Sequence, residues 1–365
     1  MPPLSIMVKP ASALCNLRCE YCFYKDVAQN REQSQYALMT RETAAALIKK
    51  SLSFADGAPV SFTFQGGEPT LAGIDYYRNF VADLNELNTL NSPVYLSIQT
   101  NGMLINAEWA HFFANNNFLT GLSLDGDFEA NKFRKDEKGR NSFYRILKTA
   151  EILKKHGAQF NVVAVLTGYS SRKGAEIYKF FKSEGFKNIQ FIPCLKPFGF
   201  EGDSELFMTP SEYADFLTDV FPLYADDYKK GRYISVRQFD NWVRLWLGGA
   251  AEQCGMNGFC SRQFVCESNG NMYPCDFYCT DEYLLGNINE LAFEDIAFCD
   301  TAKKFVNGSA EMPDRCADCE YLKLCRAGGC KRTRQSADYC EAYKKFFKEC
   351  LPLFEYFDNL KNNRS

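Results

Sequence analysis

Short apolar runs alternate with amphipathic stretches through the first half of the chain. The runs at residues 4–8, 60–64, 94–98, 120–124, 160–166 and 189–193 are short and rich in β-branched and aromatic residues, as buried strands are. Between them, apolar residues recur at helical spacing at residues 40–51, 76–87, 107–115, 142–156 and 174–184. Strands that alternate with helices form a parallel sheet covered by helices. The pattern therefore predicts an α/β fold, an open partial (β/α)6 barrel.

The alternation stops after residue 197. A loop to residue 208 precedes two predicted helices, at residues 211–230 and 238–247. Beyond them, 12 of the 16 cysteines lie between Cys254 and Cys350, in a segment with few long periodic stretches. We therefore expect two domains, residues 1–235 and residues 236–365. The second is expected to be organised by metal rather than by a large hydrophobic core, and to end in a helix.

Composition and charge exclude several classes of function. The 42 Lys and Arg against 45 Asp and Glu leave a net charge of −3, so no basic surface favours nucleic acid. No stretch approaches the roughly 20 apolar residues of a membrane span, and residues 1–14 lack the pattern of a signal peptide. We expect a cytoplasmic protein with no membrane partner. In that reducing compartment, clustered cysteines are more often metal ligands than disulfides.

The first cysteines form a compact C-x3-C-x2-C group. Cys15, Cys19 and Cys22 follow the first predicted strand on one short loop. Three thiolates can hold three irons of a 4Fe-4S cluster, whose four irons ordinarily need four cysteines. The fourth iron then keeps a position open for a substrate or cofactor. A three-cysteine zinc site with a distant fourth ligand is the alternative.

This group, with Tyr21 before its last cysteine, resembles the signature of the radical S-adenosylmethionine enzymes. The resemblance implies that S-adenosylmethionine binds the open iron and is cleaved to a 5′-deoxyadenosyl radical, which abstracts hydrogen from an unactivated carbon. Residues 64–69 resemble the family's GGEP motif, in which Gly67 meets the cofactor. Further cofactor contacts are implied for Tyr21, Ser123, Arg134 and Leu195. For the polar segments 99–102 and 123–126, ordinary strand-to-helix turns are the alternative.

The later cysteines resemble the SPASM extension of radical enzymes that modify peptides and proteins. The spacing from Cys325 to Cys330 is one residue longer than is usual there. The resemblance implies two auxiliary 4Fe-4S clusters, and so three in all. The first takes Cys254, Cys260, Cys275 and Cys330, and the second takes Cys316, Cys319, Cys325 and Cys340. A pair of four-cysteine zinc sites is the alternative. Small apolar packing roles suffice for Cys194, Cys266, Cys279, Cys299 and Cys350.

Over nearly its whole length the chain resembles the anaerobic sulfatase-maturating enzymes, most distinctively at residues 254–258 and 273–278. The resemblance implies oxidation of a cysteine or serine, within a Cys/Ser-x-Pro-x-Arg segment of an unfolded sulfatase, to Cα-formylglycine. An electron donor such as flavodoxin or ferredoxin is implied as a partner. The resemblance implies Asp276 as the base, because it matches the family's proposed proton acceptor and lies next to the ligand Cys275. A solvated turn aspartate or a helix cap is the alternative.

Two other functions remain open at this stage. One is modification of a ribosomally made peptide, by a thioether or other crosslink. Such enzymes usually carry an added N-terminal recognition domain, for which residues 1–14 leave no room. The other is a non-catalytic binding module organised by zinc. Residues 127–131 depart from the maturase pattern, which often has a histidine there, and His111 and His156 are expected to be structural.

Overall fold

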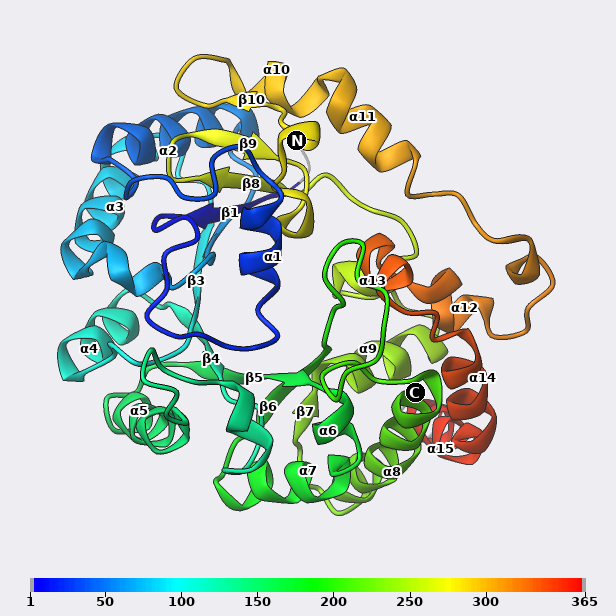
Figure 1. Cartoon of the computed structure of the whole chain (residues 1–365). Coiled ribbons are helices and arrows are strands. Elements are labelled where there is room, and N and C mark those ends of the chain that lie inside the picture. The colour runs from blue at the N-terminus through cyan, green and yellow to red at the C-terminus, as the bar shows by residue number, and fades with distance from the viewer. Residues whose placement is uncertain (1–2, 363–365) are drawn as a thin grey trace. The chain divides into compact units, whose positions relative to one another are not determined.

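The computed structural model describes residues 3–362, which form two compact units (Figure 1). The first contains residues 3–123, 134–160 and 262–307, and the second contains residues 124–133, 161–261 and 308–362. Each unit is therefore built from segments that are far apart in the sequence. No helix in the described part of the chain is both long and apolar enough to cross a membrane.

The first unit is centred on a mostly parallel sheet. Its strand order is β10-β9-β8-β1-β2-β3-β4. Four strands run parallel in chain order: β1 (Leu4–Lys9), β2 (Val60–Phe64), β3 (Val94–Thr100) and β4 (Leu119–Ser123). On the other side of β1 lie β8 (Phe264–Glu267), which is parallel to it, and the antiparallel strands β9 (Asn271–Tyr273) and β10 (Gly286–Asn287). The loops that follow β1 to β4 consequently meet at one edge of the sheet.

Helices cover the outer side of these strands (Figure 1). Phe64 of β2 packs edge-on against Phe80 and Tyr77, with 4.9 Å between ring centroids in each pair. Thr40 caps the second helix, because its Oγ1 accepts the backbone N–H of Thr43 at 3.2 Å. The helices of the unit as a whole are α1 (Phe23–Gln29), α2 (Arg41–Ala55), α3 (Ile74–Leu87), α4 (Ala107–Asn115), α5 (Phe143–Lys155), α10 (Phe293–Phe298) and α11 (Asp300–Asn307). Of these, α2, α3, α4 and α5 lie on the outer side (Figure 1).

The second unit has a smaller parallel sheet and more helix. Its strands are β5 (Phe160–Leu166), β6 (Asn188–Pro193) and β7 (Ser235–Val236). Its helices are α6 (Gly168–Ser171), α7 (Gly174–Ser183), α8 (Pro210–Lys229), α9 (Arg237–Trp246), α12 (Leu322–Cys325), α13 (Lys331–Ser336), α14 (Cys340–Glu349) and α15 (Leu351–Asn362). All six strands and all seven helices predicted from the pattern are confirmed, with ends that differ by no more than a few residues.

The expectation that the C-terminal third lacks a large hydrophobic core is wrong. The helices α14 and α15 bury aromatic side chains against α8 and α9. Phe346 lies 5.2 Å from Phe221 and 5.0 Å from Trp242 between ring centroids, and Phe354 lies 4.7 Å from Phe221. The apolar partners of this segment come from residues 210–246, so the composition of the segment itself does not predict this core.

The same third of the chain also supplies strands. Residues 264–287 contain β8, β9 and β10, which extend the first sheet beyond β1. Each has only two to four residues. Such short runs carry too little periodicity to be recognised in the sequence.

Candidate functional site

The three cysteines of the C-x3-C-x2-C group lie on one loop of the first unit, between β1 and α1. Cys22 immediately precedes α1 as its N-cap residue. The loop is tied to the segment after β2, because the N–H of Gly67 donates to the Ser12 carbonyl at 2.8 Å and that of Glu68 donates to the Leu14 carbonyl at 2.7 Å. The loop is therefore held by backbone hydrogen bonds on the side facing β2.

The glycines after β2 are required by this contact. A Cβ on Gly67 would lie 2.1 Å from the Leu14 carbonyl oxygen, and one on Gly66 would lie 2.8 Å from the Ser12 oxygen. Gly66 also has a φ of +114°, which residues with a side chain rarely adopt. These glycines make room for the backbone of the cysteine loop. That reason for the glycines was not predicted from the sequence.

Polar groups point at the sulfur atoms of this loop. The Leu17 N–H and the Asn101 side-chain amide donate to Cys15 Sγ at 3.4 and 3.7 Å, and the Arg134 guanidinium lies 4.0 Å from Cys19 Sγ. Burial, with help from the nearby Glu68 carboxylate and Cys22 thiol, raises the pKa of the Cys15 thiol to about 11. Donors of this kind stabilise thiolate ligands, so the site fits a cysteine-bound cluster.

Glu68 connects the loops that follow β2 and β3. Its buried carboxylate accepts hydrogen bonds from the backbone N–H groups of Thr70 at 3.1 Å and Asn101 at 2.7 Å, and from the Thr100 hydroxyl at 2.7 Å. Burial raises the pKa of this carboxyl, against the effect of those donors. Asn101, whose side chain reaches Cys15, is thereby positioned by Glu68. Neither residue has an individual role that its motif predicts from the sequence.

Two of the expected cofactor contacts, Ser123 and Leu195, lie at the ends of strands, whereas Arg134 follows a short 3-10 helix at Ala130–Phe133. Ser123 is the last residue of β4, and its Oγ accepts a hydrogen bond from the Gln99 amide at 2.8 Å. The Arg134 guanidinium lies 5.6 Å from the centroid of the Tyr21 ring. Leu195 follows β6 in the second unit. Tyr21, Gly67 and Arg134 of the first unit thus lie at the cysteine loop, whereas Ser123 lies at the end of β4.

Asp276 lies in a buried polar cluster of the first unit. It begins a short 3-10 turn after Cys275. Its Oδ1 lies 2.9 Å from the Lys9 ammonium, and its Oδ2 accepts a hydrogen bond from the Tyr24 hydroxyl at 2.7 Å. The Tyr24 hydroxyl is also 2.9 Å from the side-chain oxygen of Gln65. Asp276 is therefore neither a solvated turn residue nor a helix cap.

The cluster extends to residues for which the sequence motifs predict no role. Lys9 is 2% exposed, lies 3.6 Å from Glu267 and donates to Cys279 Sγ at 3.2 Å. Glu267 in turn accepts from the Arg31 guanidinium at 2.7 Å. A usable signal did exist, because Lys9 and Glu267 are charged residues at the ends of otherwise apolar strand runs. Cys279 thus has a polar contact beyond the packing role expected of it.

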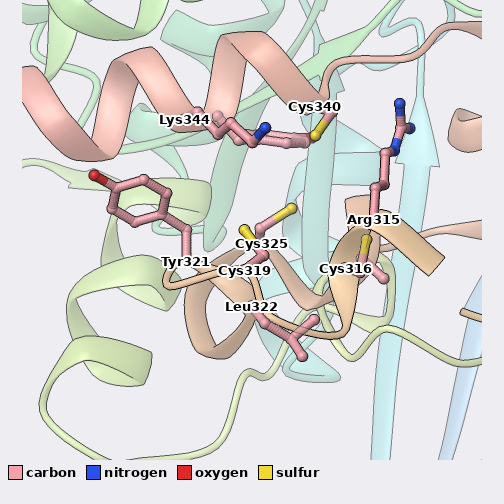
Figure 2. Close-up of a pocket in the computed structure, with 10 residues that line it drawn as sticks. Arg315, Cys316, Cys319, Tyr321, Leu322, Cys325, Cys340 and Lys344 are labelled. Atoms are coloured by element: carbon pink, nitrogen blue, oxygen red, sulfur yellow. The ribbon is translucent and has the colours of Figure 1, made fainter. Parts of the chain in front are cut away.

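In the second unit, four cysteines line one pocket. Figure 2 shows Cys316, Cys319, Cys325 and Cys340 around a common space, with Arg315 and Lys344 beside it. The Gly328 N–H donates to Cys325 Sγ at 3.2 Å, and burial raises the pKa of the Cys325 thiol to about 11. The arrangement fits a four-cysteine cluster site.

The extra residue between Cys325 and Cys330 is absorbed by a tight turn. Arg326, Ala327, Gly328 and Gly329 all have positive φ, at 51°, 54°, 81° and 70°. A Cβ on Gly329 would lie 2.0 Å from the carbonyl oxygen of Gly255, so this turn packs directly on the residue after Cys254. The insertion therefore brings Cys330 next to the loop of Cys254 rather than displacing it.

Three of the cysteines expected in the first auxiliary set interact in the second unit. Burial raises the pKa of the Cys254 thiol, and the neighbouring Cys330 and Cys260 thiols raise it further. The Cys260 N–H donates to the Ser309 hydroxyl at 2.7 Å. The fourth, Cys275, follows β9 in the first unit.

Among residues 3–362, no three His, Cys, Asp or Glu side chains come close enough together to hold one metal ion between them. In a 4Fe-4S cluster each thiolate binds a different iron, so the sulfur atoms lie farther apart than around a single ion. None of the sixteen cysteines forms a disulfide. Buried packing roles are confirmed for Cys194, Cys266 and Cys350.

The remaining sequence candidates are held by local contacts. His111 and His156 lie against each other, with 4.2 Å between ring centroids. Asn131, in the segment that departs from the maturase pattern, is fully buried, and its Oδ1 accepts the Asp125 N–H at 3.2 Å.

Comparison with known proteins adds independent findings. Residues 10–181 match the Radical SAM superfamily, and residues 256–320 match SPASM, an iron-sulfur cluster-binding domain. The chain is 40% identical to a cysteine-type anaerobic sulfatase-maturating enzyme of Clostridium novyi, over 98% of this chain and 97% of that protein. It is 29% identical to a serine-type enzyme of Bacteroides thetaiotaomicron, over 97% and 91%. A solved structure of native anSMEcpe with bound AdoMet and Cp18Cys peptide superposes with a TM-score of 0.92 at 38% identity, over 98% of this chain and 100% of that one.

Proposed function

Because this chain belongs to the anaerobic sulfatase-maturating enzymes of the radical SAM superfamily, we propose that it oxidises a peptidyl cysteine of a sulfatase to Cα-formylglycine. It has a mixed α/β fold with a radical SAM domain and a C-terminal SPASM domain, and it is an oxidising enzyme rather than a non-catalytic binding module. Our choice of cysteine rests on the 40% identity to a cysteine-type relative, against 29% to a serine-type one. We retain residues 1–235 and 236–365 as the proposed division between the domains.

We propose three 4Fe-4S clusters. Cys15, Cys19 and Cys22 would hold the one that binds S-adenosylmethionine, which the donors aimed at Cys15 and Cys19 support. The pocket between α14 and the turn before α12 supports Cys316, Cys319, Cys325 and Cys340 as one auxiliary set. The electrostatic influence of the Cys260 and Cys330 thiols on the pKa of Cys254 supports the other set, with Cys275 as its fourth member.

The cofactor would be oriented by residues at the strand ends. We assign Tyr21, Gly67, Ser123 and Arg134 to this task, together with Leu195 of the second unit. The buried Arg134 is already placed over Tyr21, and Ser123 is held by Gln99, so these side chains are preorganised. When bound, the cluster and S-adenosylmethionine supply a 5′-deoxyadenosyl radical that takes one hydrogen atom from the substrate β-carbon.

We assign the proton transfer to Asp276. The substrate thiol gives its proton to the Asp276 carboxylate while the β-carbon loses a hydrogen atom, and the one further electron leaves the substrate for an oxidised auxiliary 4Fe-4S cluster. The resulting thioaldehyde reacts with water to give the aldehyde and hydrogen sulfide. The Tyr24 hydroxyl donates to Oδ2 of that carboxylate, which restricts the directions in which its remaining lone pairs point.

The decisive experiment is anaerobic turnover of the reconstituted enzyme. It is incubated with S-adenosylmethionine, a reductant and a Cys-x-Pro-x-Arg peptide, and the aldehyde is captured with a hydrazine and identified by mass spectrometry. We expect the aldehyde from this peptide, less from a matched serine peptide and none from a matched alanine peptide. Release of 5′-deoxyadenosine with every peptide left intact would contradict the proposed substrate. Flavodoxin and ferredoxin, the proposed physiological donors, can then replace the chemical reductant in the same assay.

A further inference from the structure

The most unusual charged group in the first unit is Lys9. It is the last residue of β1, its side chain is 3% exposed, and it precedes the cysteine loop. A buried ammonium is costly unless anionic or polar partners surround it. Nothing in the reaction assigned above uses Lys9 directly, so its burial requires another explanation.

The partners of Lys9 come from distant parts of the chain. Its Nζ lies 2.9 Å from Asp276 Oδ1, 3.2 Å from Cys279 Sγ and 3.6 Å from Glu267 Oε1. Glu267 is the residue that pairs with Lys9 in the register of β1 and β8. The Tyr24 ring covers the same ammonium at 5.0 Å from the ring centroid. Burial alone would lower the pKa of Lys9, but Asp276, Cys279 and Glu267 together raise it above its ordinary value, so the group is cationic.

The charges in this cluster divide into two pairs. Arg31 lies 2.7 Å from Glu267 and so provides its closest cation. Lys9 is closer to Asp276 than to Glu267, and is therefore the cation available to Asp276. Two cations and two carboxylates leave the buried group neutral. Removing Lys9 would leave the Asp276 carboxylate with only the Tyr24 hydroxyl to hold it.

We propose that Lys9 is a positioning residue for Asp276: it holds Oδ1, so that the lone pair of Oδ2 that Tyr24 does not use can receive the substrate proton. This inference rests on the proposed role of Asp276 in cysteine oxidation. Lys9 acts on the proton transfer from the substrate sulfur to the Asp276 carboxylate, and not on cleavage of S-adenosylmethionine. Loss of Lys9 should therefore separate the two events.

The test compares Lys9→Met with the wild-type enzyme in anaerobic turnover of the Cys-x-Pro-x-Arg peptide. Both 5′-deoxyadenosine and aldehyde are measured, together with iron content. For Lys9→Met we expect wild-type iron content, an unchanged KM for the peptide and aldehyde per deoxyadenosine reduced about tenfold or more. Lys9→Arg, which keeps the cation, should recover part of the lost yield of aldehyde per 5′-deoxyadenosine.

A charge-balanced variant separates positioning from folding. The double variant Lys9→Met/Glu267→Gln keeps one cation, Arg31, and one carboxylate, Asp276, so the buried cluster stays neutral. It can therefore be tested even where Lys9→Met alone does not fold. Formation of 5′-deoxyadenosine with a reduced yield of aldehyde in this double variant supports the inference. A wild-type ratio of aldehyde to 5′-deoxyadenosine in Lys9→Met or in the double variant overturns it. So does a proportional fall of aldehyde, 5′-deoxyadenosine and iron content in both of these variants. Failure of the wild-type enzyme to form aldehyde would instead count against the proposed function.

Discussion

At the scale of single residues, the site depends on side chains that converge from separate motifs. Tyr24 follows the cysteine loop, Gln65 follows β2 and Asp276 follows β9, yet the Tyr24 hydroxyl contacts both of the others. Each lies in a segment that was recognised from the sequence, but their mutual contact was not predicted. The position of Asp276 is what brings its carboxylate into contact with Tyr24 and Lys9.

Replacement of the carboxylate tests that role. Asp276→Asn keeps the shape and the neighbours of the side chain but removes its capacity to accept a proton at physiological pH. We expect wild-type iron content and continued formation of 5′-deoxyadenosine, with aldehyde formation reduced about a hundredfold. Mass spectrometry of the peptide measures the product. Wild-type turnover would remove Asp276 from the reaction.

At the scale of elements, the turn between Cys325 and Cys330 carries the clearest strain. Arg326 and Ala327 occupy the left-handed region although both have side chains. A left-handed conformation is costly for such residues, and glycine adopts it freely. The longer spacing between Cys325 and Cys330 is therefore tolerated at some cost in local stability.

Ala327→Gly should relieve part of that strain. We expect a gain of about 0.5–1 kcal/mol in the free energy of unfolding. The strain removed from the folded state is larger than the cost of the extra conformational entropy that glycine gives the unfolded chain. Ala342→Gly, in the helix α14, is the matched control and should lose about 1 kcal/mol. Denaturant unfolding of the reconstituted protein measures both. A loss of stability in Ala327→Gly would show that the turn is not strained.

The contact of α14 with α8 and α9 is the second element-scale test. Phe346 is fully buried among Phe221, Trp242 and Phe354. Phe346→Ala should reduce the free energy of unfolding by about 3–5 kcal/mol, since a large aromatic ring leaves a cavity. Tyr144→Ala, at a side chain that is 71% exposed, should change it by less than about 0.5 kcal/mol. Equal effects of the two substitutions would contradict the buried core.

At the scale of the whole molecule, the cysteine sets are separable. Cys15, Cys19 and Cys22 lie on one loop of the first unit, whereas Cys316, Cys319, Cys325 and Cys340 line a pocket of the second. Each set has its own local support from backbone hydrogen bonds. Loss of the first set should therefore leave the second able to bind its cluster.

Replacing Cys15, Cys19 and Cys22 together by alanine should remove one of three clusters. We expect the iron content per chain to fall by one third and formation of 5′-deoxyadenosine to cease, while the auxiliary clusters still give their charge-transfer absorption. Iron analysis and anaerobic absorption spectra measure the two effects. Unchanged iron content would refute the ligand assignment of this loop.

The local pattern of the sequence was sufficient for the strands β1 to β6, the helices between them and the spacing of the cysteine groups. These features depend on residues within a few positions of each other, so periodicity and spacing reveal them directly. Family resemblance added the reaction class, which the comparison with known proteins confirmed.

Only the tertiary structure decided which residues from distant parts of the chain contact these strands, helices and cysteine groups. Lys9 meets Glu267 and Asp276 only because β8 adds to the edge of β1, and β8 is four residues long. Likewise the C-terminal helices find their apolar partners on α8 and α9, more than a hundred positions earlier. A contact between distant residues leaves no periodic trace in either segment, because it arises from how the folded chain closes on itself and not from the order of neighbouring residues.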